Sequence, residues 1–245
     1  MPIDYSIIIP AYNEEDYLAE TLTALHKAIL HLDLQGELIV VDNNSSDNTA
    51  SIADHHSATV VFEPINQISR ARNAGAKQAQ GRYLVFVDAD TIIPPDLLQQ
   101  ALENLESGEI IGGGACLSGN IPLGFSMRIL LKIWNGISII TRNAAGSFIY
   151  CHREAFEIIG GFSENVYASE EIWLSRKLKK LGRKQRQKFK IIKHPPVITS
   201  MRKMQWYSPL RIYLYLFMIA IFPFSVRFKT LCTFWYRKPT NDNNI

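Results

Sequence analysis

Four short apolar runs, alternating with segments of helical spacing, constrain the fold of this chain more than any other feature of its sequence. The runs are residues 5–10, 37–42, 58–62 and 82–88. They are nearly continuously apolar and rich in β-branched and aromatic residues, as is typical of strands buried on both faces of a parallel sheet. The sequence therefore predicts an α/β fold with a doubly wound sheet.

Three helix-forming segments, residues 14–30, 47–55 and 68–80, separate these runs. The polar residues 45–47 are candidate N-caps for the second helix, and Gly81 is expected to end the third. Crossovers between parallel strands are right-handed, and ligands of such sheets bind beyond the carboxyl ends of the strands. We therefore expect the functional residues at that rim.

Polar residues follow the expected strands in three clusters at this rim, residues 10–14, 42–44 and 88–90. The loop after the first strand reads AYNEE and lacks the glycines of a dinucleotide-binding loop or a P-loop. It also lacks the glycine-rich basic loop that a sugar nucleotidyltransferase needs. The sequence therefore argues against all three classes.

Asp88 and Asp90 bring two carboxylates, separated by one residue, to the end of the fourth strand. Carboxylate oxygens suit Mg²⁺ or Mn²⁺, and such a cation allows an acidic rim to hold a phosphorylated ligand. Asp is also a common turn residue, so the alternative role of Asp90 is to turn the chain toward residues 91–95.

Four motifs give the chain a resemblance to a known family. They are PAYNEE after the first strand, VVDNNSSDNT after the second, ARNAGAKQAQGRYLVFVDADT around the fourth and GGFSENVYASEEIWLSRKLKKLGR later on. In order and spacing they resemble family 2 glycosyltransferases over residues 4–202. The resemblance implies a GT-A fold with a mixed sheet, and inverting, Mg²⁺- or Mn²⁺-dependent transfer of a sugar from a nucleotide-sugar to an acceptor hydroxyl. The alternatives are a GT-A-like module that binds a nucleotide-sugar without transferring it, and a sugar nucleotidyltransferase.

The resemblance also assigns residues to the nucleotide site. Asp42 matches the carboxylate that accepts hydrogen bonds from the base or the ribose. Pro10, Tyr12 and Glu14 match residues that line the nucleotide pocket, although simple packing at the rim would also explain Tyr12. Arg72, with Arg70 as a weaker neighbour, matches an arginine near the nucleotide; a solvated helical arginine is the alternative.

The metal site implied by the resemblance consists of Asp88, which also adjoins the nucleotide, and Asp90, the more direct ligand. A later histidine often completes this site in relatives, and His194 is the candidate by position. A surface role for this histidine is the alternative. Arg202 or Lys203 matches a family element that meets the diphosphate, and solvation of both is the alternative.

A pair of glutamates occupies the motif of the catalytic base. Many relatives have Glu-Asp at this point, so Glu171 is the predicted base, but its longer side chain leaves Glu170 open. A base at this position accepts the proton of the acceptor hydroxyl. The alternative is structural: Ser169 caps a helix, and two acids favour its positive N-terminus.

Charge is distributed unevenly along the chain. Residues 1–171 contain 9 basic and 22 acidic residues, whereas residues 172–245 contain 17 basic residues and 1 acidic residue. Such asymmetry indicates an anionic partner. The densest basic stretch, residues 176–193, has a single aromatic residue and lacks the interleaved rings of single-strand nucleic-acid platforms. A membrane surface is therefore favoured over nucleic acid, and a solvated basic surface is the alternative.

Residues 212–226 form an apolar run of fifteen uncharged residues. A helix needs about 20 apolar residues to span a bilayer. We therefore expect residues 206–245 to lie at a membrane interface, near a lipid or lipid-linked acceptor. A helix packed on the catalytic domain, or a dimer contact, is the alternative.

The expected organisation is one catalytic unit in three parts. Residues 1–110 bind the nucleotide-sugar, residues 111–205 carry the acceptor site and the base, and residues 206–245 form the tail. The N-terminal sequence lacks the features of a secretory leader, which predicts a cytoplasmic enzyme, peripheral on the inner face of the membrane. The three cysteines are widely spaced and are expected to be buried and unpaired.

Overall fold

The computed structural model describes residues 2–202, 206, 212, 214, 226–228 and 232. Most of the expected tail, residues 206–245, therefore lies outside the described residues, as does Lys203. Cys116, Cys151 and Cys232 are buried, as expected.

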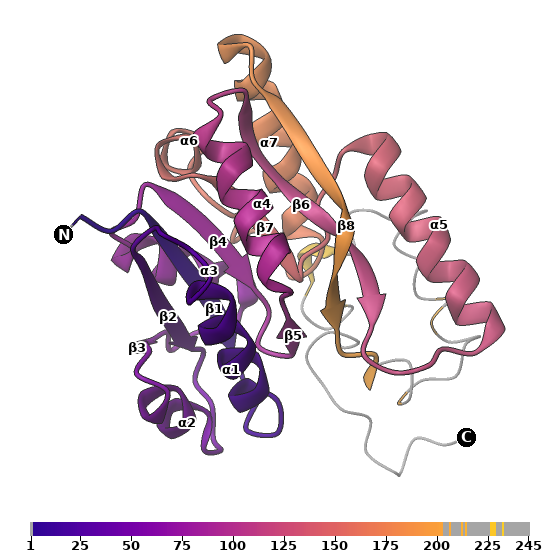
Figure 1. Ribbon diagram of the computed structural model, residues 1–245. Helices are drawn as coiled ribbons and strands as arrows, with labels where there is room; N and C mark the ends of the chain where they lie inside the picture. The colour runs from indigo at the N-terminus through magenta and orange to yellow at the C-terminus, as the bar shows by residue number, and fades with distance from the viewer. Residues whose placement is uncertain are drawn as a thin grey trace.

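Strands and helices alternate in the first half of the chain, as the apolar pattern predicts (Figure 1). The elements are β1 (Tyr5–Ala11), α1 (Leu18–Ile29), β2 (Gly36–Asp42), α2 (Thr49–His55), β3 (Thr59–Phe62), α3 (Ile68–Gln78) and β4 (Tyr83–Val87). Each of the four expected strands is confirmed to within one residue at either end.

The first helix begins later than expected, because residues 14–17 form a turn. The carbonyl oxygen of Glu14 accepts hydrogen bonds from the backbone N–H groups of Tyr17 and Leu18. The N–H of Glu14 donates to Oγ1 of Thr49 over 2.8 Å. This turn therefore ties the loop after β1 to the start of α2.

The start of α2 also differs from the expectation. Its N-cap residue is Asn48 and not one of residues 45–47, and the Asn48 side chain makes no capping hydrogen bond. Asp47 nevertheless accepts the N–H of Thr49 over 3.0 Å. A polar side chain therefore satisfies a backbone donor of the first turn from just outside the helix.

The expected role of Gly81 as the end of α3 is wrong. The helix ends at Gln78, and its C-cap residue Ala79 has an extended backbone. A Cβ atom on Gly81 would lie 2.5 Å from the carbonyl carbon of Tyr5. The glycine is required because the chain enters β4 in close contact with the backbone of β1.

The second half adds four strands and four helices among the described residues. They are β5 (Thr91–Ile92), α4 (Pro95–Glu106), β6 (Ile110–Gly119), α5 (Phe125–Thr141), β7 (Phe148–His152), α6 (Arg153–Ile158), α7 (Glu170–Gln185) and β8 (Lys188–Thr199). The expected boundary after residue 110 falls at the start of β6, and both halves contribute strands to one sheet.

The eight strands form a mixed sheet in the order β3-β2-β1-β4-β7-β6-β8-β5. β1, β2, β3 and β4 are parallel, β7 runs antiparallel to β4 and β6, and β8 is parallel to β6. The chain first winds outward from β1 to β3 and then returns to β4 on the other side of β1. The doubly wound mixed sheet is therefore confirmed, and its switch point lies between β1 and β4.

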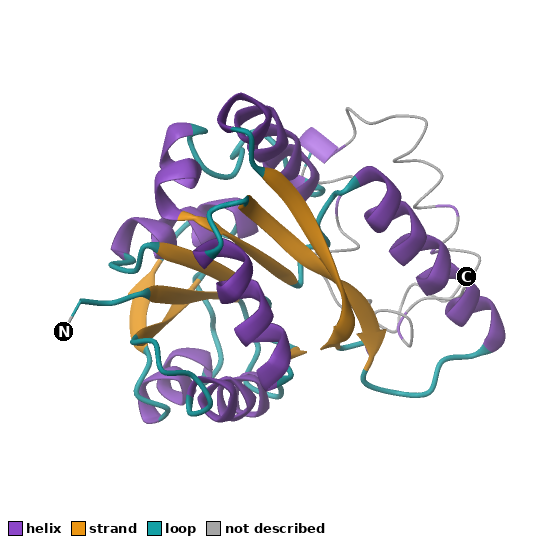
Figure 2. Cartoon of the chain, turned by 45° about the horizontal axis from the view of Figure 1, so that its top comes forward, coloured by secondary structure: helices purple, strands orange, loops and turns teal. Residues whose placement is uncertain are grey.

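Helices cover both faces of this sheet (Figures 1 and 2). One face packs against α1 and α4 through residues such as Leu22 and Leu98, and the other packs against α3, α6 and α7 through residues such as Ala71, Phe156 and Leu174. Burial on both faces explains why the strand sequences are continuously apolar.

The strand directions bring the carboxyl ends of β1, β2, β4, β6 and β8 to one rim, where β7 begins. The polar clusters expected at strand ends therefore meet in space. Within the described part of the chain, no helix is both long and apolar enough to cross a membrane.

Candidate functional site

Hydrogen bonds join the loops after β1 and β2 into one part of the rim. The N–H of Asn13 donates to Oγ of Ser45 over 3.1 Å, and the N–H of Ser46 donates to Oδ1 of Asn13 over 2.8 Å. Asn13 and Asn44 have left-handed backbones, with φ of 53° and 65°, which asparagine tolerates better than most residues. The polar loop sequences therefore form a fixed structure.

Three residues expected to contact the nucleotide lie at adjacent strand ends in this part of the rim. Asp42, the last residue of β2, is buried, and its Oδ1 accepts the N–H of Ser45 over 3.0 Å. Pro10 pairs in register with Val41 on the neighbouring strand, and Tyr12 follows β1 with its side chain exposed.

The guanidinium group of Arg72 joins four segments at the centre of the rim. Arg72 is fully buried in α3. Its Nη1 donates to Oε1 of Glu170 over 2.7 Å, and its Nη2 donates to Oδ1 of Asp88 over 2.8 Å and to the carbonyl oxygen of Gly146 over 2.9 Å. One arginine therefore fixes the end of β4, the approach to β7 and the start of α7.

The surrounding charges keep this arginine protonated. Burial alone would lower the pKa of Arg72, but the charges of Asp88, Glu170 and Glu171 raise it above its ordinary value. The guanidinium carbon also lies 5.1 Å from the centre of the Phe162 ring, within reach of a cation–π contact. The alternative of a solvated Arg72 is therefore excluded.

The two glutamates at the start of α7 have different surroundings. Glu170 is buried and paired with Arg72, whereas Glu171 has no ion pair within the described residues. Glu171 is half-buried. Burial, and then the negative charge of Glu170, raise the pKa of Glu171 to about 8. The alternative in which the side chain of Ser169 caps α7 is wrong, because Ser169 makes no side-chain capping bond.

Gln67, the N-cap residue of α3, and Asn73 within the helix hold the loop before α7, and neither is among the predicted site residues. Nε2 of Gln67 donates to the carbonyl oxygens of Glu164 and Val166 over 2.8 and 2.9 Å. Asn73 exchanges two hydrogen bonds of 3.0 Å with the backbone of Phe162. The only sequence signal for Asn73 is its place in the ARN motif, and Gln67 has none.

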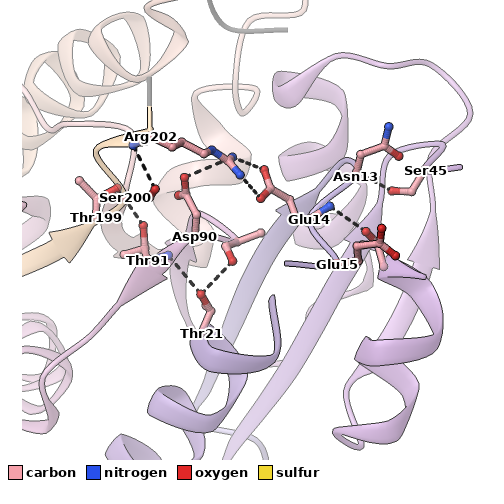
Figure 3. Close-up of polar contacts among 12 residues, drawn as sticks. Asn13, Glu14, Glu15, Thr21, Ser45, Asp90, Thr91, Thr199, Ser200 and Arg202 are labelled. Atoms are coloured by element: carbon pink, nitrogen blue, oxygen red, sulfur yellow. Dashed lines mark hydrogen bonds and ion pairs between the residues drawn. The ribbon is translucent and has the colours of Figure 1, made fainter. Parts of the chain in front are cut away.

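A second arginine, Arg202, lies between two acidic residues of the rim (Figure 3). Its Nη1 donates to Oε2 of Glu14 over 2.6 Å, its Nη2 donates to Oε1 of the same carboxylate, and Nη2 lies 3.2 Å from Oδ2 of Asp90. The rings of Tyr17 and Trp206 lie 4.7 and 5.6 Å from its guanidinium carbon. The alternative of a solvated Arg202 is therefore also excluded.

Hydrogen bonds on both sides fix the backbone around Asp90 (Figure 3). Oγ1 of Thr21, a buried residue of α1, donates to the carbonyl oxygen of Ala89 over 2.8 Å and accepts the N–H of Thr91 over 3.1 Å. The N–H of Ser200 donates to the carbonyl oxygen of Asp90 over 3.1 Å. The carboxylate of Asp90 therefore extends from a rigid segment.

His194 does not lie with the two aspartates. Thr199, five residues further along β8, is the residue that pairs with Thr91, and the His194 side chain is exposed. Among the residues that the structure describes, no three His, Cys, Asp or Glu side chains are grouped so that they could hold a metal ion. Asp90 shares Arg202 with Glu14, and Asp88 shares Arg72 with Glu170.

Solved structures with the same architecture place the fold in the GT-A class of glycosyltransferases. Mannosyltransferase PcManGT from Pyrobaculum calidifontis, in complex with GDP-Man and Mn²⁺, has a TM-score of 0.68 and 21% identity over 93% of this chain and 65% of that chain. Glucosyl-3-phosphoglycerate synthase from Mycobacterium tuberculosis, in complex with Mn²⁺, UDP and glucosyl-3-phosphoglycerate, has a TM-score of 0.63 and 18% identity over 92% and 80%. At these identities the similarity concerns the fold.

The chain belongs to glycosyl transferase family 2, because the model of that family matches residues 6–159. Undecaprenyl-phosphate 4-deoxy-4-formamido-L-arabinose transferase from Proteus mirabilis is 33% identical over 115 residues, which are 44% of this chain and 35% of that protein. Dolichol-phosphate mannosyltransferase from Pyrococcus furiosus is 32% identical over 115 residues, which are 45% of this chain and 32% of that protein. The chain thus spans about a third of the length of these curated relatives. The predicted family is confirmed.

Proposed function

We propose that this chain is an inverting, metal-dependent glycosyltransferase that moves a sugar from a nucleotide-sugar to an acceptor hydroxyl. The proposal rests on a group of three carboxylates around one buried arginine. Asp88 and Glu170 bind Arg72 at 2.8 and 2.7 Å, and the neighbouring Glu171 has a pKa raised to about 8. A carboxyl group with a raised pKa at a ligand-binding rim suits general-base catalysis.

The nucleotide is proposed to bind over the loops after β1 and β2. Asp42 would accept hydrogen bonds from the base or the ribose, and Pro10, Tyr12 and Glu14 would line the pocket. Their positions at adjacent strand ends, next to the switch point of the sheet, support this assignment. The two similar structures, solved with GDP-Man and with UDP, support a nucleoside diphosphate as the recognised group.

A divalent cation, Mg²⁺ or Mn²⁺, is proposed to bind Asp90 and Asp88. Their hard oxygens suit such ions, which are commonly held by one or two carboxylates together with substrate phosphates. The bound cation would neutralise charge on the diphosphate leaving group. Arg202, which contacts Glu14 and Asp90, is close enough to this region to bind the same diphosphate. His194 is left out of this proposed site, because it lies five residues before the β8 residue that pairs with Thr91.

Glu171 is proposed to be the catalytic base. In its ionised form it accepts the proton of the acceptor hydroxyl, and the hydroxyl oxygen forms a bond to the anomeric carbon. The bond from that carbon to the diphosphate oxygen breaks on the opposite face, and the nucleoside diphosphate leaves with the electron pair. One displacement of this kind inverts the configuration. Glu170 is less suited, because Arg72 holds its carboxylate.

A lipid or lipid-linked acceptor is proposed for an enzyme that is cytoplasmic and peripheral on the inner face of the membrane. The names of two relatives contain undecaprenyl phosphate and dolichol phosphate. The excess of basic residues after residue 171 supports attraction to an anionic surface.

A donor screen tests the proposed activity. Purified protein is incubated with UDP-, GDP- and dTDP-sugars and with Mn²⁺, Mg²⁺ or a chelator, and the released nucleoside diphosphate is measured. We expect metal-dependent release from one donor class, which Glu171→Gln should reduce by a factor of about 10² to 10⁴ without loss of donor binding. Donor binding without turnover under any condition would favour the non-catalytic module. Formation of pyrophosphate from a nucleoside triphosphate and a sugar phosphate would favour the nucleotidyltransferase.

A further inference from the structure

One face of α5 is apolar and exposed to solvent. Five large residues on this face are between 42% and 83% exposed: Phe125, Ile129, Ile133, Ile137 and Ile140. At about 100° per residue they fall within an arc of about 120°, opposite Met127 and Ser138, the buried residues of the helix. A contiguous apolar surface of this kind marks an interaction site.

The opposite side of α5 is fastened to the sheet. Asn135 exchanges two hydrogen bonds of 2.9 Å with the backbone N–H and carbonyl oxygen of Leu117 in β6. Figure 1 shows the helix beside β6 and β8, at one side of the molecule. The fold therefore holds the apolar face outward.

Positive charge accompanies this face. Residues 110–153 contain no Asp or Glu. Arg128 and Lys132, both exposed, lie on α5 beside the apolar residues. An apolar helix face with basic residues alongside is the pattern of helices that lie in the interface of an anionic membrane.

The apolar face ends at a basic hollow between α5 and α7. Ile140 lines this hollow together with Arg142, Lys179, Arg183 and Lys188, and its lining includes no acidic residue. Its volume is about 380 Å³. Within the described residues, none of these four cations has an ion pair with a carboxylate.

These cations repel one another. Nζ of Lys179 is held 2.8 Å from both the carbonyl oxygen of Thr141 and Oδ1 of Asn143. Burial, and then the charges of Arg176 and Arg183, lower the pKa of Lys179. A bound anion would relieve this repulsion, so the hollow suits a phosphate group.

The N-terminal end of α5 lies near the rim that carries the candidate site. Asn120, five residues before α5, donates its N–H to the carbonyl oxygen of Thr199 over 3.2 Å and accepts the N–H of Met201 over 3.1 Å. Arg202, which binds Glu14 and Asp90, is the next residue. A membrane against the start of α5 would therefore lie near the segment that carries Arg202.

We propose that the exposed face of α5 and the adjoining basic hollow form one docking surface for an anionic lipid bilayer. The isoleucines insert among the lipids, and Arg142, Lys179, Arg183 and Lys188 bind headgroup phosphates. This inference rests on the lipid-linked acceptor proposed above, and it assigns membrane binding to the catalytic domain in addition to the C-terminal tail.

Vesicle co-sedimentation of the full chain tests this surface. Phosphatidylcholine vesicles with and without phosphatidylglycerol are compared at low and high salt. The wild type should bind the anionic vesicles, and salt should weaken this binding without abolishing it, because apolar insertion is not screened. Ile140→Asp should weaken binding by about tenfold or more. Replacing Arg142 and Arg183 together by Gln should remove the preference for anionic vesicles.

Matched variants control for exposure and charge. Leu30, at the end of α1, is 83% exposed, as Ile140 is, and Leu30→Asp should bind like the wild type. Replacing Lys27 and Lys77, two exposed lysines of α1 and α3, by Gln should keep the preference for anionic vesicles. Thermal midpoints of all variants verify that each one is folded.

Three results would overturn the proposal. They are a wild type that binds no vesicles, an Ile140→Asp variant that binds as well as the wild type, and a vesicle-free dimer that Ile140→Asp dissociates. Donor hydrolysis without vesicles separates this proposal from the proposed function. Hydrolysis without vesicle binding removes only the docking surface, whereas vesicle binding without hydrolysis of any donor removes only the activity.

Discussion

Nη1 of Arg72 donates a hydrogen bond of 2.7 Å to Oε1 of Glu170, which lies 98 residues further along the chain. Both side chains are almost entirely buried, at 1% and 6% exposure. The contact joins the middle of α3 to the first residue of α7. It also gives two adjacent glutamates different environments, since Glu170 is neutralised by a cation and Glu171 is not.

Removal of Arg72 should destabilise the fold strongly. Arg72→Ala leaves Glu170 and Asp88 without their partner, and such a loss in a buried pair costs about 3–5 kcal/mol. Urea unfolding measures the free energy of unfolding. Arg70→Ala is the control, because Arg70 is 32% exposed where it pairs with Glu63 and Glu164, and it should cost less than about 1 kcal/mol. Equal effects of the two substitutions would contradict a structural role of the buried pair.

Glu171→Gln should reduce transfer by a factor of about 10² to 10⁴, the usual contribution of a positioned base. Donor binding should be unchanged, because the substitution preserves the shape of the side chain. Glu170→Gln should instead lower stability, since it weakens the pair with Arg72, and should reduce transfer less. Steady-state rates and donor titrations of both variants show which of the two glutamates is the base. A larger rate loss for Glu170→Gln would make that residue the base.

The raised pKa of Glu171 predicts how stability changes with pH. Its pKa is about 8 in the folded chain against an ordinary value of 4.5, so the folded state binds the proton more tightly than the unfolded state. The resulting stabilisation is complete below about pH 4.5 and is lost as the pH rises through about 8. Glutamine does not titrate, so the thermal midpoint of Glu171→Gln, measured relative to that of the wild type, should rise as the pH is raised from about 5 to about 9. A constant difference would exclude a raised pKa.

The two aspartates of the rim should respond differently to substitution. Asp90→Asn should abolish metal-dependent transfer and lower the thermal midpoint only slightly, because Arg202 keeps its second partner, Glu14. Asp88→Asn should abolish transfer and also lower the midpoint, because Asp88 pairs with the fully buried Arg72. Wild-type turnover in either variant would exclude that residue from the metal site.

Truncation after Ser208 should destabilise the loop before α7. Val226 and Cys232 are buried with Val166 and Ala168, and the N–H of Tyr167 donates to the carbonyl oxygen of Val226 over 2.6 Å. We expect a lower thermal midpoint and slower donor hydrolysis. Truncation after Lys238 retains both buried residues and is the control. If truncation after Ser208 leaves the rate of donor hydrolysis unchanged, the tail serves only as an anchor.

The sequence by itself determined the class of fold and the rim. Apolar runs such as residues 37–42 and 82–88 are local signals, because burial on both faces of a sheet requires continuous apolar sequence. The direction of parallel strands then places their polar ends at one edge, which is why Asp42, Asp88 and Asp90 could be assigned to a common rim. The sequence determined the ends of the helices less well, because contacts outside a helix, such as those of the turn before α1, set where it begins.

Only the tertiary structure decided which charged residues pair. Arg202 binds Glu14 across 188 residues and Arg72 binds Glu170 across 98, distances over which local sequence carries no pairing information. These contacts depend on the order of strands in the sheet, which brings β8 to the rim and α7 against α3. The difference between Glu170 and Glu171 follows from them, because adjacent residues with the same side chain differ in their surroundings only through the partners that folding supplies.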